Sequence, residues 1–158
     1  MKRLVLAAAL GLTLGAASAA DPHANGTHRA PAPDTRTVLQ LSPDERAVLL
    51  QEMHLFLDGV RKMTAALAQQ DLAAAAAAAR PLGMKMGQTM PQALRAKLPL
   101  EFRQLAGPLH ADFDQMALDA ESMKDVSYTL TQLSATLQKC AGCHAAFQIR
   151  MTGSQDGH

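Results

Sequence analysis

Cys140 and Cys143 are the only two cysteines in this chain of 158 residues, and His144 follows at once in the string CAGCH. Cysteine pairs separated by two residues serve in zinc sites, in thiol–disulfide exchange and in covalent attachment of haem. A structural zinc site needs four ligands, and the chain has no second pair. A redox pair of the thioredoxin type opens a helix after a strand, whereas this pair lies inside a long helical pattern. In Cys-x-x-Cys-His the thiols form thioethers to the haem vinyl groups and the histidine binds the iron, so the motif predicts one covalent haem c.

The second axial position of the iron needs a donor from another helix. Met53 lies on the apolar stripe of a helix expected to pack antiparallel beside the motif, at the level of His144, and its thioether is the predicted distal ligand. Met63 is on the same stripe but about 15 Å farther along, which favours a core role. An open five-coordinate iron and ligation by His54 remain alternatives. For His54 and for His110 we expect a solvated flank, with His110 at a height where it could border the haem edge.

Four amphipathic segments must position these residues. The first starts at Ser42, Pro43 and Glu45, which provide a cap, a proline at the first helical position and a capping-box glutamate. Asp71 caps the second, where Pro81 predicts a kink or a restart. The apolar spacings alternate between four and three residues and no segment alternates like a strand, so we expect an all-α antiparallel up-down-up-down four-helix bundle with a covalently attached haem. The apolar stripes of the four segments are Leu49, Met53, Phe56, Val60, Met63 and Leu67; Leu72, Ala75, Ala79, Leu82 and Met86; Phe102, Leu105, Leu109, Phe113, Met116 and Ala120; and Val126, Leu130, Leu133, Leu137, Cys140, His144, Phe147 and Met151.

Over residues 42–151 the chain resembles the class II c-type cytochromes, which include cytochrome c prime and its low-spin, methionine-ligated relatives. The resemblance rests on CAGCH near the end of the last of four helices, with VRKM at 60–63 and CHAAF as weaker matches. It implies a haem-binding four-helix bundle, and it places Met53 where the low-spin members carry their ligand. Family members can dimerise through their first two helices, so a homodimer is possible.

The start of the chain predicts export. Lys2 and Arg3 precede a short apolar run, and Ala17-Ser18-Ala19 fits signal-peptidase cleavage, so residues 1–19 are expected to be a removed signal, with a retained membrane anchor as the alternative. Residues 20–41 then form a flexible arm, 42–151 the cytochrome domain and 152–158 a disordered tail. Removal of Lys2 and Arg3 moves the formal net charge from +1 to −1, which gives no electrostatic case for nucleic-acid binding. Aromatic residues are only 3% of the chain, and a haem would supply the flat apolar body that its core lacks.

These expectations predict a periplasmic electron carrier of a Gram-negative bacterium, without enzymatic activity, that meets redox partner proteins through transient contacts. The first alternative is a five-coordinate protein, like cytochrome c prime, that binds small gases such as nitric oxide and carbon monoxide. A distant alternative is a haem-free helical bundle that binds copper through residues of two groups, a histidine arm and a methionine cluster. The candidates for that site are His23, His28, Met84, Met86 and Met90.

Overall fold

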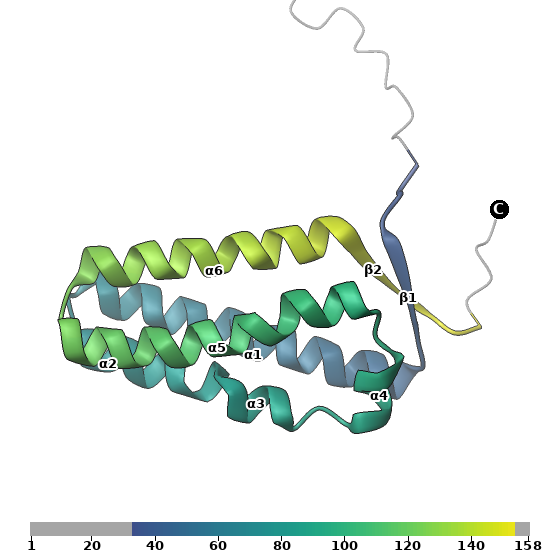
Figure 1. Cartoon of the computed structure of the whole chain (residues 1–158), viewed down its shortest axis with the longest axis horizontal. Helices are drawn as coiled ribbons and strands as arrows, with labels where there is room; N and C mark the ends of the chain where they lie inside the picture. The colour runs from purple at the N-terminus through teal and green to yellow at the C-terminus, as the bar shows by residue number, and fades with distance from the viewer. Residues whose placement is uncertain (1–32, 154–158) are drawn as a thin grey trace, which may run out of the picture. The chain divides into compact units, whose positions relative to one another are not determined.

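The computed structural model of the chain describes residues 33–153, which form three long helices, several short ones and a two-stranded parallel sheet (Figure 1). The predicted signal, the arm as far as residue 32 with His23 and His28, and the tail from residue 154 lie outside the described residues. Among residues 33–153, no helix combines the length and the apolar character needed to cross a membrane.

Helix α1 spans Pro43–Ala68 and begins as the sequence predicts. The Ser42 hydroxyl accepts a hydrogen bond from the Glu45 amide at 3.2 Å, and the Glu45 carboxylate accepts one from the Ser42 amide at 2.8 Å, which completes the capping box. The predicted apolar stripe faces the interior, since each of its members is buried or half-buried. The sequence signals of this helix are local, and tertiary packing reinforces them.

The second predicted segment is broken into short elements. Asp71 caps α2 (Leu72–Ala79) by accepting a hydrogen bond from the Ala74 amide at 2.9 Å. The expected interruption at Pro81 is confirmed, because the α-helix gives way there to the 3₁₀ turn η1 (Arg80–Leu82). Two further short helices, α3 (Met84–Gln88) and α4 (Gln92–Lys97), lead to the next long helix.

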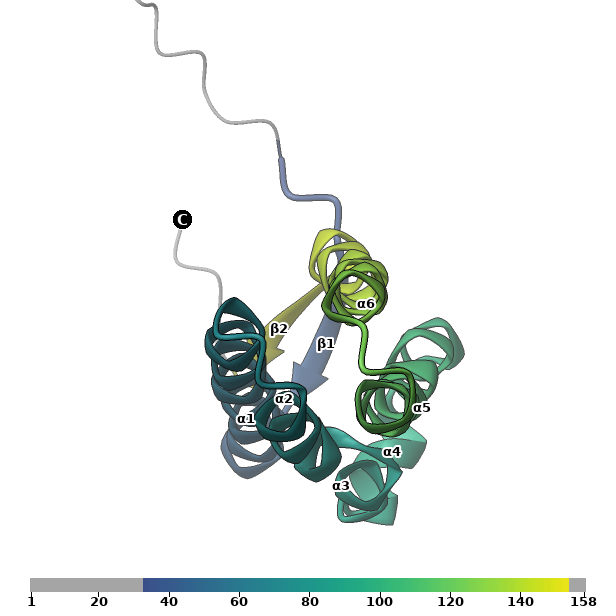
Figure 2. The same ribbon diagram turned by 90° about the vertical axis from the view of Figure 1, so that its left-hand side faces the viewer.

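Helices α5 (Leu100–Met123) and α6 (Val126–Ala146) are joined by a tight turn in which Lys124 adopts left-handed backbone angles, with φ 53°. Viewed along the helices, α5 and α6 lie side by side (Figure 2). The predicted stripe of α6 is partly wrong, because Leu130 and Leu137 are 44% and 42% exposed and His144 is exposed as well, whereas Thr129 and Thr136 are buried. Both threonine hydroxyls donate to backbone carbonyls one turn earlier, which satisfies them inside the core.

The strands correct two expectations. Strand β1 (Thr37–Leu41) occupies part of the segment predicted to be a flexible arm, and strand β2 (Phe147–Met151) begins where the last helix was expected to continue. The two strands pair in parallel, with Thr37 opposite Phe147 and Leu41 opposite Met151. The expectation that the chain has no strand is therefore wrong. Leu39 and Leu41 are buried, so apolar contacts at the end of α6 stabilise a pairing between distant segments.

The buried side chains fall into two groups, which we call the central cluster and the strand-end cluster. The central cluster lies among α1, α2, α5 and α6, and the strand-end cluster lies among the strands, α4 and the N-terminal parts of α1 and α5. Met53 packs against both groups, Cys140 against the central cluster and Cys143 against the strand-end cluster. The large members of the central cluster are Phe56, Met63, Leu67, Leu82, Leu109, Phe113, Met116 and Leu133, and the strand-end cluster is Leu39, Leu41, Leu49, Leu94, Leu98, Phe102 and Phe147.

Candidate functional site

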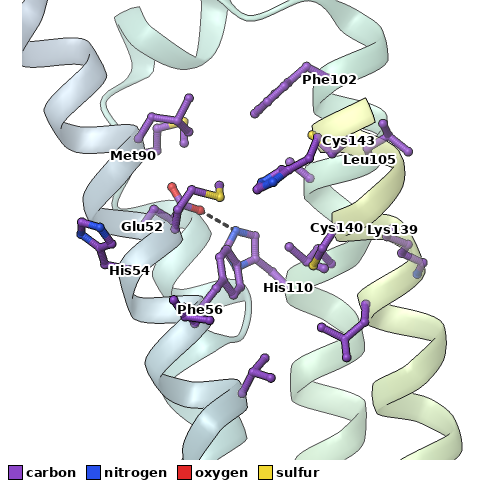
Figure 3. A pocket seen from close by; sticks show the side chains of 18 residues that line it. Glu52, His54, Phe56, Met90, Phe102, Leu105, His110, Lys139, Cys140 and Cys143 are labelled. Carbon is purple, nitrogen blue, oxygen red and sulfur yellow. Dashed lines mark hydrogen bonds and ion pairs between the residues drawn. The ribbon is translucent and has the colours of Figure 1, made fainter. Parts of the chain in front are cut away.

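A cavity of about 300 Å³ opens among α1, α5 and α6 (Figure 3). It touches both buried clusters, and most of its wall is aliphatic or aromatic. All four residues predicted to hold a haem contribute to this one cavity. Its lining consists of Leu49, Glu52, Met53, His54, Phe56, Leu57 and Val60 from α1, Met90, then Phe102, Leu105, Ala106, Leu109 and His110 from α5, and Leu137, Lys139, Cys140, Cys143 and His144 from α6.

The last two turns of α6 present Cys140, Cys143 and His144 to the cavity. Both cysteines are free and half-buried. Burial disfavours the thiolate and raises the pKa of both thiols, and the neighbouring Cys140 raises the pKa of Cys143 further. The two groups are therefore neutral thiols near neutral pH, which is the opposite of the activated thiolate found in redox-exchange pairs.

Helix α1 presents Met53 to the same cavity from another wall. Met53 is half-buried at the junction of the two clusters, while His54, its neighbour, is exposed as expected. Met63 is 1% exposed in the central cluster, in accord with its predicted core role.

Met90 is a second thioether in the cavity wall, and its position was not anticipated from the sequence. The sequence groups it with Met84 and Met86, but these two do not line this cavity: Met84 is exposed and Met86 packs against the central cluster. The turn that follows α3 brings Met90 to the cavity, and the sequence motif that ends this segment, Gln-Thr-Met-Pro at 88–91, does not indicate which way the methionine points.

Glu52 and His110 form a buried ion pair in the cavity wall (Figure 3). The side chains of His110 and Glu52 are 7% and 12% exposed, so the expected solvated position of His110 is wrong. The His110 Nε2 atom lies 3.0 Å from the Glu52 Oε1 atom, and Nδ1 lies 2.8 Å from the carbonyl oxygen of Leu82. Burial by itself lowers the pKa of His110, but the hydrogen bonds to Glu52 and Leu82 outweigh it and the pKa rises above 6.5. Both ring nitrogens face acceptors, so the geometry suits an imidazolium that donates twice.

A second ionic contact ties α6 to α5 beside the cysteines. The Lys139 ammonium group pairs with the carboxylate of Asp112, whose Oδ2 atom also lies 3.4 Å from the hydroxyl oxygen of Thr136. Lys139 lines the cavity, and this contact holds its charged end toward α5. The turn of α6 that bears Cys140 is thus fixed by polar contacts as well as by packing.

Arg36, just before β1, holds the end of α6. Its guanidinium group donates to the carbonyl oxygen of His144 at 3.2 Å and to the carboxylate of Asp34 at 2.6 Å. The hydrogen bonds from Arg36 lower the pKa of Asp34 to about 2, so this carboxylate stays charged over the physiological range. The Gln148 amide donates back to the Arg36 carbonyl at 3.2 Å.

The donor set fits a haem c better than the other candidate groups. The cavity is large and apolar, and two neutral thiols, an imidazole and a thioether contribute to its wall. The thiols can bond to the edge of a flat apolar cofactor, and the imidazole and the thioether can bind its metal. Among residues 33–153, no group of three or more histidine, cysteine and acidic side chains is arranged to hold a metal ion by itself. Cys140, Cys143, His144 and Met53 are the residues that would hold the haem.

Comparison of the chain with protein-family models, with curated proteins and with solved structures finds no match, so the case for a function rests on the residues themselves.

Proposed function

We propose that this chain is a c-type cytochrome that carries single electrons in the periplasm, and that it is not an enzyme. Cys140 and Cys143 would bind the haem through thioether bonds, His144 would be its proximal ligand and Met53 its distal ligand. The observation that carries the proposal is that all four side chains line one apolar cavity although they come from two different helices. When bound, the haem would supply an iron that alternates between the ferric and ferrous states.

The arrangement of the helices supports a more specific proposal about the architecture. We interpret α1, the broken segment from α2 to α3, α5 and α6 as the four helices of an up-down-up-down bundle, as in the class II c-type cytochromes that the sequence resembles. Helices α1, α5 and α6 then contribute the walls of the haem cavity, and α2 packs behind α1 and α5. The two-stranded sheet would be an addition of this chain at the ligand end.

The surrounding residues would exclude water and restrict ligands. Phe56, Leu105 and Leu109 give the cavity an apolar wall that favours a closed, six-coordinate iron over an exchangeable water. Filled axial positions favour outer-sphere electron transfer to transiently bound redox partners over binding of a substrate.

Spectra of the protein matured with a c-type haem system test the proposal. We expect the haem to stay on the wild-type chain in a denaturing gel. We expect the Cys140→Ser/Cys143→Ser variant to lose it. The ferrous protein is expected to show sharp low-spin bands that carbon monoxide leaves unchanged. A broad ferrous spectrum that shifts promptly with the gas would instead favour the five-coordinate, gas-binding alternative.

Two thioethers in one cavity offer a matched pair of variants for the distal ligand. Exchange of methionine for leucine roughly preserves side-chain volume while removing the sulfur donor. Met53→Leu is expected to open the iron to carbon monoxide, and Met90→Leu is expected to leave it closed. The opposite result would assign the distal position to Met90.

A further inference from the structure

Glu52 and His110 lie in the wall shared by two cavities. Both residues line the main cavity and also a second one of about 210 Å³ that lies toward α3 and α4. Glu52 belongs to α1 and directly precedes Met53, whereas His110 belongs to α5. The hydrogen bond between them at 3.0 Å therefore connects the turn that carries Met53 to a neighbouring helix.

The imidazole of His110 is held from several sides. Its Nδ1 atom lies 2.8 Å from the Leu82 carbonyl of η1, and the Phe56 ring of α1 lies 5.1 Å from it between centroids. A Cβ atom added to Gly87 of α3 would lie 2.7 Å from the His110 Cδ2 atom and 2.9 Å from Nε2, so only glycine leaves room for the ring. Three other elements thus determine where His110 meets Glu52.

Successive residues of a helix point about 100° apart, so fixing Glu52 also fixes the direction of Met53 about the α1 axis. A methionine side chain has three rotatable bonds and a weakly coordinating sulfur atom. A methionine that can reach the iron therefore binds it firmly only if its side chain is held in the right direction. Groups that orient a metal ligand without touching the metal contribute to the strength of the metal–ligand bond.

We propose that His110, acting through Glu52, is a positioning residue that directs the Met53 thioether toward the haem iron. The inference rests on the proposed function, since it requires Met53 to be the distal ligand. Breaking the bond between His110 and Glu52 allows α1 to turn and weakens the bond from Met53 to the iron. The fold can survive this change, because the two buried clusters remain.

Two substitutions at His110 separate its two hydrogen bonds. The amide nitrogen of glutamine falls near the position of Nε2, so His110→Gln can keep the bond to Glu52 and gives up the one to Leu82. The amide nitrogen of asparagine falls near Nδ1, so His110→Asn can keep the bond to the Leu82 carbonyl and gives up the one to Glu52. The readouts are the ferric charge-transfer band of the methionine–iron bond and the affinity of the ferrous protein for carbon monoxide.

His110→Asn is expected to weaken the charge-transfer band and to raise the affinity for carbon monoxide about tenfold or more, whereas His110→Gln restores most of the closed state. Gly87→Ala crowds the same ring and is expected to act like His110→Asn. Gly107→Ala is its control, because an added Cβ there has no neighbour within 4 Å although Gly107 lines the second cavity. If His110→Asn does not fold, the two glycine variants decide the question.

The wild-type spectrum separates the two ways in which the inference can fail. A wild-type protein that binds carbon monoxide promptly overturns methionine ligation, and the positioning role falls with it. A closed wild-type protein whose His110→Asn and His110→Gln spectra are equal, or whose Gly87→Ala and Gly107→Ala spectra are equal, overturns the positioning role alone.

Discussion

Without the proposed haem, the chain is expected to fold only marginally. The cavity measures about 300 Å³, and an apolar cavity that remains in a folded protein costs about 24 cal/mol per Å³, which gives up to about 7 kcal/mol here. This value is an upper limit, because water can enter and the helices can relax. A domain of this size has a free energy of unfolding of about 5–15 kcal/mol, so the cost of an empty cavity is comparable to the whole stability of the fold.

The comparison uses urea unfolding followed by far-ultraviolet circular dichroism. The haem-loaded protein is compared with the Cys140→Ser/Cys143→Ser variant purified free of haem, since serine differs from cysteine by one atom. The haem-free variant is expected to unfold at a much lower urea concentration. Equal midpoints would refute the reasoning, because the cavity would then carry no energetic penalty.

Filling the cavity gives a sharper form of the same test. Ala106 is half-buried in the cavity wall, and Ala106→Leu adds three carbon atoms, worth about 2 kcal/mol after the loss of side-chain entropy. We expect it to stabilise the haem-free variant and to reduce haem attachment in the wild-type background. Ala111→Leu, at an exposed position of the same helix, is the control. A substitution at Ala106 that destabilises both forms would show that this wall borders no usable space.

Three further predictions concern the strands, His110 and the motif helix. Leu41→Ala, in a side chain 1% exposed, is expected to lower the free energy of unfolding by about 2–5 kcal/mol, while exposed Gln40→Ala changes it by less than about 0.5 kcal/mol; similar urea midpoints for the two would contradict a structural role of β1. The pKa of His110 is raised above 6.5 in the folded chain, so its stabilisation is complete below that pH and is lost as the pH rises through the folded-state pKa. The free energies of unfolding of wild type and His110→Gln should therefore differ most at about pH 5, and this difference should shrink toward about pH 9. A difference that grows with pH would contradict a raised pKa of His110. Gly142→Ala is expected to stabilise α6 by up to about 1 kcal/mol, because an added Cβ meets nothing within 4 Å; a lower thermal midpoint would contradict it.

The features predicted from the sequence are those with local causes. The Ser42 capping box, the apolar stripe of α1 and the break at Pro81 each depend on residues within a few positions of one another, and each is found. The cavity lining of Cys140 and Met53 also follows from helical register, because register fixes which face of a helix a residue occupies.

The features not predicted depend on distant partners. Strand β1 pairs with a segment 110 positions later, and the spacing of Phe147 and Met151 continues the helical pattern of α6 although both lie in a strand. His110 is buried because Glu52, 58 positions earlier, supplies a carboxylate. One signal was available: His110 shares a helical face with Ala106, Phe113 and Ala117, three and four positions apart, which is an apolar setting for an imidazole.

The pairing of β1 with β2 also sets an order on folding during synthesis. Strand β1 precedes α1 and strand β2 follows α6, so a ribosome has made every helix of the described part before β1 meets its partner. Phe147 is the only member of the strand-end cluster that follows CAGCH along the chain, so the cluster is complete only after the motif has been synthesised. Cys143 packs against that cluster, so the CAGCH motif is synthesised before the sheet beside it can close.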